Sequence, residues 1–371
     1  MEPITHFLTG ACISRAGLNR KSAYATVVAT LAAEAADIDI LWGFAGPVEE
    51  LKHHRGITHT FLGAPFVAAA VVGTVWLFHC WRESRRKLES SSESEVTPNR
   101  TGKRVHWGWL YLIALIAALS HLFLDWTNNY GLRPFFPFNP RWYEGSFVFI
   151  AEPVLWVLLG LALVVPWVLG MTDREIGAKR TPFRGQGWAI FALSAMVVVW
   201  GVRWAEHAQA VAMLENTQIT SEPILRIAVE PYPVNIFHWH AIVETRDYYQ
   251  MADINTRTGA MVSDGQRDVL YKPTDTPAIE AAKRTFLGRV YLDWGSWAVV
   301  RDLGQDPVQG MDPPQLPPRR TWTTVEFTDL RFDYAFRGEG RLKGPPPLSG
   351  WVYIVDGHED AGEAMDGREQ K

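Results

Sequence analysis

The chain has 371 residues, with 36 lysines and arginines against 40 aspartates and glutamates, and a formal net charge of −4. This balance argues against nucleic-acid binding, which relies on a concentrated basic surface. The two cysteines, Cys12 and Cys80, lie in apolar segments without metal-ligand spacing, so we expect any metal ligands to be His, Asp or Glu. The mean hydropathy of −0.06 averages an apolar first part and a polar part that begins near residue 206.

Segments long enough to cross a bilayer occupy the first part of the chain. A helix that crosses the hydrocarbon core needs about 20 apolar residues. Four segments meet this requirement: 61–81, 107–126, 147–170 and 187–205. A fifth, 24–44, is also long enough but contains acidic residues, and we interpret it as a span with a polar outer end. The shorter apolar stretch 4–17 before it is expected to be a re-entrant or interfacial helix.

Lysine and arginine residues predict the orientation of these spans. They concentrate in the loops 15–21, 82–106 and 171–186, which strict alternation of spans places on one side of the membrane. Loops rich in these cations stay in the cytoplasm, so the C-terminal part is predicted to lie outside the cytoplasm of a bacterial inner membrane. Inside the second loop, the Ser-, Glu- and Arg-rich segment 84–103 is expected to be a disordered linker.

The polar C-terminal part shows no span and has the patterns of a small mixed domain. Strands are predicted at 323–334 and 351–357, a hairpin at 241–259, and a helix at 276–286 capped by Thr276. His238 and His240 would share one face of a strand, but no acidic residue lies close to them in sequence, so we expect both on the surface.

These patterns predict a mainly α fold with two domains. Residues 1–205 form a polytopic helical membrane domain, and residues 206–371 form an extramembrane α+β domain rich in strands. We expect the second domain to cover a site in the first or to hold a partner.

Histidine and aspartate residues recur at one end of the predicted spans. The candidates are His6, Asp37, Asp39, His54, His59, His121 and Asp125. The predicted topology places them toward the outer side, with His6 there if the helix 4–17 enters from outside. His79 and His106 fall on the cytoplasmic side and are excluded. An ionisable group in the membrane costs roughly 2.5–3.5 kcal/mol on insertion scales, so such residues are usually functional.

The spacing of these residues suggests how they hold an ion. His121 and Asp125 are four residues apart, so in a helix they share one face and can bind one ion together. His54 and His59 are five apart and do not share a straight helix face. Gly56 between them permits a turn that brings both inward.

Two aspartates and one arginine are candidates for the remaining chemistry. Asp37 and Asp39 diverge in a regular helix, so one is expected to be a ligand and the other a partner or proton acceptor. Asp39 is our choice for the proton acceptor, and Arg55 is expected to steady phosphoryl or other oxyanion oxygens. Mixed imidazole and carboxylate ligands suit zinc, with manganese or iron as alternatives, and their number allows one or two ions.

Several stretches resemble a known family. They are THFLTG at 5–10, ADIDIL at 36–41, HRGITHT at 54–60, and SHLFLDWTNNYG with PFFPF within 120–138. They resemble the YdjM-type bacterial inner-membrane hydrolases, which are also described as LexA-binding, and the resemblance covers most of residues 1–205. The hydrolase description rests on a His/Asp pattern similar to that of zinc-dependent phospholipases C. The metal ligands that this likeness implies are His6, Asp37, His54, His59, His121 and Asp125.

The sequence therefore predicts a membrane-bound, metal-dependent hydrolase. Its substrate is expected to be an ester or phosphoester of a membrane lipid or lipid-linked molecule at the outer interface. Two alternatives stay open. A transporter or metal-handling protein predicts ligands spread through the membrane depth, and a non-catalytic scaffold predicts that the His and Asp residues can be exchanged without consequence.

Overall fold

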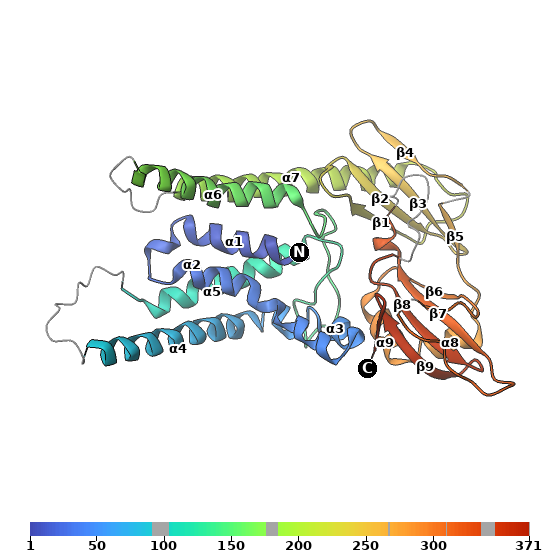
Figure 1. The fold of residues 1–371 in the computed structure, drawn as a ribbon. Coiled ribbons are helices and arrows are strands. Elements are labelled where there is room, and N and C mark those ends of the chain that lie inside the picture. The colour runs from blue at the N-terminus through green and yellow to red at the C-terminus, as the bar shows by residue number, and fades with distance from the viewer. Residues whose placement is uncertain (91–103, 176–184, 266–267, 309, 335–345, 371) are drawn as a thin grey trace. The chain divides into compact units, whose positions relative to one another are not determined.

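A computed structural model describes residues 1–90, 104–175, 185–265, 268–308, 310–334 and 346–370 of the chain (Figure 1). Contacts divide the chain into two units. The first consists of Met1–Ile38 and Arg55–Val202, and the second of Asp39–His54 and Arg203–Lys371. The sequence analysis put the boundary between residues 205 and 206 and kept 39–54 in the membrane domain, whereas the structure groups this segment with the C-terminal part.

The first unit is helical. Its helices are α1 (Pro3–Arg15), α2 (Ala25–Glu34), α4 (Ala64–Ser90), α5 (Trp107–Trp126), α6 (Pro153–Glu175) and the first part of α7 (Gln186–Asn216). Its 3-10 turns are η1 (Leu18–Arg20), the first four residues of η2 (Ala35–Ala45) and η3 (Ile57–His59). The helices α4, α5, α6 and α7 are each long and apolar enough to cross a membrane. The four predicted spans are therefore confirmed, although α6 begins at Pro153 and not at residue 147.

The fifth predicted span is wrong as a continuous helix. In place of 24–44 the chain forms the ten-residue α2 and then the 3-10 segment η2, which contains Asp37 and Asp39. At 1.5 Å per residue, α2 covers about 15 Å, roughly half of the hydrocarbon core. The tighter 3-10 winding begins just before the two aspartates, where the chain leaves the apolar pattern.

The predicted linker is also shorter than expected. The helix α4 continues to Ser90, so residues 84–90 are helical because a run of helix-forming Arg, Lys and Glu extends the apolar span. The rest of the predicted linker, 91–103, lies outside the described residues, and so does most of the cationic loop 171–186. The predicted orientation, which uses these loops, stays a prediction.

Small side chains let the helices of the first unit approach closely. The helices α1, α2, α4 and α5 pack on one another around a core rich in alanine. A Cβ at Gly10 of α1 would lie 2.7 Å from the Ala29 carbonyl oxygen and 2.7 Å from the Ala33 Cβ of α2. Close contact between small residues is the common way in which membrane helices associate. It places the ends of α1 and α2 beside α5.

The second unit is built on two antiparallel sheets. The first contains β1 (Arg226–Pro231), β2 (His238–Glu244), β3 (Tyr248–Asn255), β4 (Ala260–Val262) and β5 (Val269–Tyr271). The second has the order β10-β9-β8-β7-β6, with β6 (Ala298–Asp302), β7 (Trp322–Asp329), β8 (Gly350–Val355), β9 (Glu359–Met365) and β10 (Arg368–Glu369). The unit also contains the helices α3 (Pro47–His53), α8 (Pro277–Ala282) and α9 (Phe286–Trp294), the turn η4 (Leu330–Phe332), the last part of α7 from Arg203 and the part of η2 from Asp39.

This architecture confirms the predicted fold class, a helical membrane part followed by a β-rich domain. The predicted hairpin is present as β2, β3 and β4. Thr276 caps α8 by accepting a hydrogen bond from the Ile279 N–H at 3.2 Å. The predicted helix 276–286 nevertheless ends at Ala282, because Thr285 caps the start of a separate helix, α9.

Two further expectations for this unit are wrong. The strand predicted at 323–334 ends at Asp329, whose carboxylate accepts the Arg331 N–H at 3.0 Å and turns the chain into η4. His240 is not a surface residue, since only 3% of it is exposed and its ring lies 5.3 Å from that of Tyr334. His238 is the first residue of β2, and its side chain is 36% exposed.

Candidate metal centre

Four side chains from three elements converge within the first unit. His121 and Asp125 lie one turn apart on α5, His59 ends η3, and Asp37 lies near the start of η2. Each offers one ligand atom, and the four atoms lie within 4.8 Å of one another. The i, i+4 spacing on α5 therefore does place both residues on one face, as predicted, and two other segments add a ligand atom each.

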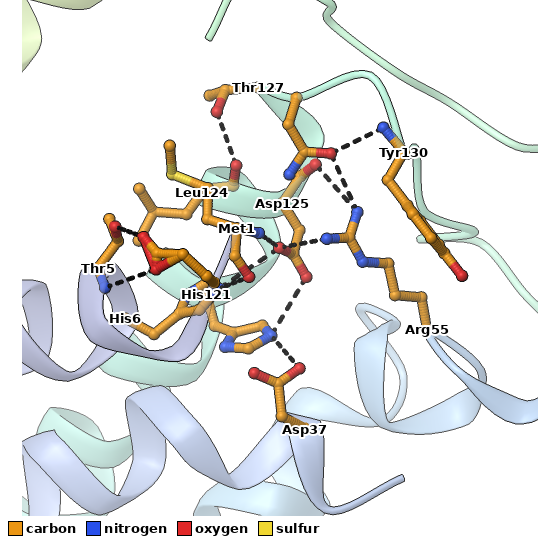
Figure 2. Close-up of polar contacts among 12 residues, drawn as sticks. Met1, Thr5, His6, Asp37, Arg55, His121, Leu124, Asp125, Thr127 and Tyr130 are labelled. Carbon is orange, nitrogen blue, oxygen red and sulfur yellow. Dashed lines mark hydrogen bonds and ion pairs between the residues drawn. The ribbon is translucent and has the colours of Figure 1, made fainter. Parts of the chain in front are cut away.

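In this group the Nε2 atom of each histidine lies close to both carboxylates. His121 Nε2 is 3.2 Å from Asp125 Oδ2 and 3.5 Å from Asp37 Oδ1 (Figure 2). His59 Nε2 is 3.1 Å from Asp37 Oδ1 and 3.4 Å from Asp125 Oδ2. The two Nε2 atoms are 3.0 Å apart. The arrangement gives two nitrogen and two oxygen donors around one point, the number that a tetrahedral zinc ion takes.

The group is buried except at one residue. His59 and His121 have no exposed surface and Asp125 has 1%, whereas 20% of the Asp37 side chain is exposed. Burying a carboxylate is costly unless a positive charge accompanies it. Asp37 is thus the member of the group through which solvent or a ligand can reach it.

The turn that carries His59 is fixed by local contacts. The Thr60 hydroxyl donates to the Ile57 carbonyl at 2.8 Å and accepts the Gly63 N–H at 2.7 Å. A side chain at position 63 would collide with the Ile57 carbonyl oxygen, so only glycine allows this close return of the chain. The turn directs His59 toward α5 before α4 begins.

The hydrogen bond made by His121 Nδ1 supports a role for this residue as a metal ligand. Its Nδ1 lies 2.6 Å from the Ala33 carbonyl oxygen, which can only accept, so Nδ1 carries the proton and donates it. In the neutral form of the ring, Nε2 then presents its lone pair to His59 and the carboxylates. A second contact that fixes the tautomer in this way is typical of metal-binding histidines.

A buried carboxylate oxygen gives a second sign that an ion fits here. Among the described residues, Asp125 Oδ2 has no hydrogen-bond donor, although it faces the Nε2 atoms of His59 and His121. A buried acceptor without a partner costs free energy, and a divalent cation between these atoms would satisfy it. The donor set therefore fits a single zinc, manganese or iron ion.

The other oxygen of Asp125 is held from the opposite side. Arg55 Nη2 donates to Asp125 Oδ1 at 2.9 Å (Figure 2). Arg55 Nη1 donates to the Gly131 carbonyl at 2.7 Å. The guanidinium also lies 4.6 Å from the centre of the Tyr130 ring, and Arg55 is 2% exposed. The amino group of Met1 forms an ion pair with the same oxygen. These contacts orient Asp125.

The remaining predicted ligands lie outside the four-residue group. His6 stacks on His121 with ring centres 3.8 Å apart, and its Nε2 is 3.4 Å from Asp125 Oδ1. His54 forms a pair with Asp39, with 3.1 Å between Nδ1 and Oδ1, on the segment that belongs to the second unit. His6, His54 and the two catalytic candidates, Asp39 and Arg55, stay predictions.

A family model described as YdjM inner membrane protein matches residues 1–210, more than half of the chain. The chain belongs to this family. The matched region contains all four residues of the group, three of the candidate spans and most of the fourth, α7, which continues to Asn216. The resemblance inferred from the sequence motifs is thereby confirmed.

One curated relative has no assigned role. It is a protein of Bacillus subtilis (strain 168) described as uncharacterized protein YfhP, 23% identical over 178 residues. The alignment covers 46% of this chain and 47% of YfhP, so the chain spans about half the length of that relative. No solved structure matches the chain.

The sequence analysis did not identify the groups that orient the reactive side chains of this site. The Ala33 carbonyl that orients His121 belongs to the main chain and has no signature in the sequence. Asn128 accepts a hydrogen bond from Arg55 Nη1 at 3.3 Å and one from the Tyr130 N–H at 2.9 Å. The N-N-Y-G run at 128–131, which begins three residues after Asp125, was the signal that could have identified it.

Proposed function

We propose that this YdjM protein is a metal-dependent hydrolase that acts on an ester or phosphoester bond of a lipid-like substrate at the membrane surface. The observation that carries the proposal is the convergence of Asp37, His59, His121 and Asp125, two of them on a membrane span. A divalent ion held by such residues acidifies bound water and polarises a phosphoryl or carbonyl oxygen, and both effects promote hydrolysis at neutral pH.

The side chains of the group have different parts in this proposal. His59, His121 and Asp125 are buried, so they would hold the ion and exclude bulk water from its inner side. Asp37 is partly exposed and would hold the ion at the side where substrate arrives. Arg55 contacts Asp125 and the Gly131 carbonyl, which supports a role in orienting that ligand. For Asp39, the proposed proton acceptor, the pairing with His54 supplies a partner that can take up positive charge.

The surroundings of the group support an amphiphilic substrate. Large apolar residues within two positions of the predicted ligands His6, Asp37 and His59 are exposed: Phe7 by 51%, Ile38 by 60% and Phe61 by 52%. In a membrane protein such side chains face lipid. A substrate with its tail in the bilayer would therefore present its polar head close to the ligands.

The compactness of the group favours hydrolysis over the two alternatives. A transport path would need ligands along the membrane depth, whereas four ligand atoms here lie within 4.8 Å of one another. A non-catalytic scaffold would not explain why a buried carboxylate oxygen of Asp125 lacks a hydrogen-bond donor among the described residues.

Metal analysis and hydrolysis assays test the proposal together. Detergent-purified protein is expected to retain about one or two divalent ions per chain and to hydrolyse phospholipids or a generic phosphodiester. His59→Ala and Asp125→Ala should lose the ion and at least about 100-fold of the activity, since even second-shell changes cost 10–100-fold. His106→Ala, which changes an exposed histidine at the start of α5, is the matched control. Absence of bound metal together with unchanged activity in both ligand variants would refute the proposal.

A further inference from the structure

The segment Asp39–His54 connects two parts of the first unit but folds with the second. Asp37 lies two residues before it, and Arg55 follows it directly. Its helix α3 packs against α9 and β9 of the C-terminal domain (Figure 1). A stretch of the membrane family's own sequence is thus part of the hydrophobic core of another domain.

The apolar face of α3 forms this attachment. Pro47, Val48 and Leu51 are buried, with Val48 fully inaccessible and Leu51 4% exposed. On the polar side, Lys52 Nζ lies 5.1 Å from the centre of the Phe286 ring at the start of α9. Burial of apolar side chains is the main stabilising contribution to such packing.

A residue 322 positions away caps the start of α3. The first N–H groups of a helix have no partner within it, and here the Val48 N–H donates to Gln370 Oε1 at 2.8 Å. The same amide donates from Nε2 to the Ala45 carbonyl at 3.0 Å. Gly46 lies between these contacts at φ +127°, and a side chain there would collide with the Gln370 amide. An ion pair between Arg368 and Glu50, 3.0 Å long, adds to the attachment.

The attached segment bears two of the predicted site residues at its ends. Asp39, 5% exposed, and His54 pair with each other, which closes the segment into a loop. The chain joins this loop through Ile38 to Asp37 on one side, and directly to Arg55 on the other. Order in the loop therefore reduces the conformational freedom of the chain at both of these residues.

We propose that the C-terminal domain is a positioning element of the candidate metal centre. By holding α3, it fixes the Asp39–His54 pair and the chain that leads from it to Asp37 and Arg55. Without this attachment the 16-residue segment would have to lose its conformational freedom each time an ion or substrate binds. The proposal rests on the proposed function, because it concerns the same metal centre.

Substitutions at Leu51 and Gln370 of the full-length protein test the proposal. Leu51→Asp should detach α3, and Gln370→Ala should weaken its first turn without altering its apolar face. Leu51→Met is the conservative variant that restores packing, and Glu369→Ala, at the exposed position before Gln370, is the matched control. The measurements are hydrogen exchange of peptides from 39–54 and the Kd for Zn²⁺ by competition with a chelator.

We expect faster exchange over 39–54 and a Zn²⁺ affinity about 10–100-fold lower in Leu51→Asp, as for loss of second-shell support. Gln370→Ala should show the same changes to a smaller degree, and Leu51→Met and Glu369→Ala should match wild type. Faster exchange over 39–54 with unchanged Zn²⁺ affinity would overturn the proposal, and so would unchanged exchange in both test variants. If Leu51→Asp unfolds the domain, Gln370→Ala alone decides.

A wild-type protein that binds no divalent ion would remove the proposed function and, with it, the role in a metal centre. Whether the C-terminal domain orders the chain beside the segment is then decided separately, by exchange of the peptide 55–63, which contains Arg55 and His59. Faster exchange there in Leu51→Asp or Gln370→Ala supports positioning, and unchanged exchange contradicts it.

Discussion

At Asp125 the two carboxylate oxygens have separate partners. Oδ1 accepts the Arg55 guanidinium, whereas Oδ2 faces the Nε2 atoms of His59 and His121. An aspartate held rigidly by one oxygen presents the other in a fixed direction, which is the preorganisation that a metal site needs. The Arg55 guanidinium is in turn held by the Gly131 carbonyl, to which Nη1 donates at 2.7 Å.

Replacing Arg55 should therefore cost stability as well as metal affinity. Arg55→Met leaves Asp125 with fewer partners, and breaking a buried ion pair typically costs about 3–5 kcal/mol. Arg55→Lys keeps the charge but loses the fork of donors, so its loss should be smaller. Thermal unfolding in detergent and Zn²⁺ binding measure both effects. Unchanged melting temperature and affinity in Arg55→Met would contradict the orienting role.

Glu363 on β9 predicts a pH dependence of the second unit. The side chain is 7% exposed, its Oε1 accepts the Leu287 N–H at 2.9 Å, and burial raises its pKa. A carboxyl with a raised pKa in the folded state favours folding while it is protonated. That contribution is complete below the ordinary glutamate pKa of about 4.3 and is lost as the pH rises through the raised value.

Glu363→Gln keeps the shape and the acceptor but cannot ionise. Its free energy of unfolding should therefore fall less between pH 4 and pH 7 than that of wild type. Denaturant unfolding followed by tryptophan fluorescence measures the difference, with the exposed Glu369→Gln as control. An identical pH slope in wild type and Glu363→Gln would show that the carboxyl is not the cause.

At the scale of elements, close packing of α1 on α2 places the predicted ligand His6 beside His121 of the four-residue group. His6 is on α1, while the Ala33 carbonyl and the chain leading to Asp37 come from α2. Gly10 allows the short distance between α1 and α2, because a Cβ at this position would lie 2.7 Å from atoms of Ala29 and Ala33.

Gly10→Ala should consequently force these helices apart. Overpacking of this kind typically costs about 1–3 kcal/mol, and the shift of α2 should also weaken ion binding through Ala33 and Asp37. Gly160→Ala on α6 is the matched control, because no atom lies within 4 Å of a Cβ there. Melting temperature and Zn²⁺ content measure the two effects. Equal behaviour of the two variants would argue that the α1–α2 contact does not support the site.

Some of these elements were predictable from sequence for simple physical reasons. Spans such as 107–126 are recognisable because an uninterrupted apolar run has few other stable environments. His121 and Asp125 were predicted as a pair because helix geometry is regular. The β3–β4 turn followed from N-T-R-T-G, in which Gly259 adopts φ +70°.

Other features depend on tertiary contacts that a linear pattern does not contain. The helix over 24–44 breaks where Asp37 turns toward residues of η3 and α5. The attachment of α3 depends on Gln370, a residue without a distinctive local pattern. His240 is buried because Tyr334 packs near it from a distant segment. In each case the deciding partner lies far away in sequence.

For the whole molecule, the side of the membrane on which the C-terminal domain lies decides which lipids the proposed hydrolase meets. The cations of the loops 15–21, 82–106 and 171–186 predict that the domain is outside the cytoplasm. In a Cys80→Ser background, with Cys12 buried, Thr258→Cys in the β3–β4 turn should react with a membrane-impermeant maleimide in intact cells. Ser84→Cys, exposed on α4, should react only after permeabilisation. The reverse pattern would place the domain in the cytoplasm and exclude substrates of the outer leaflet.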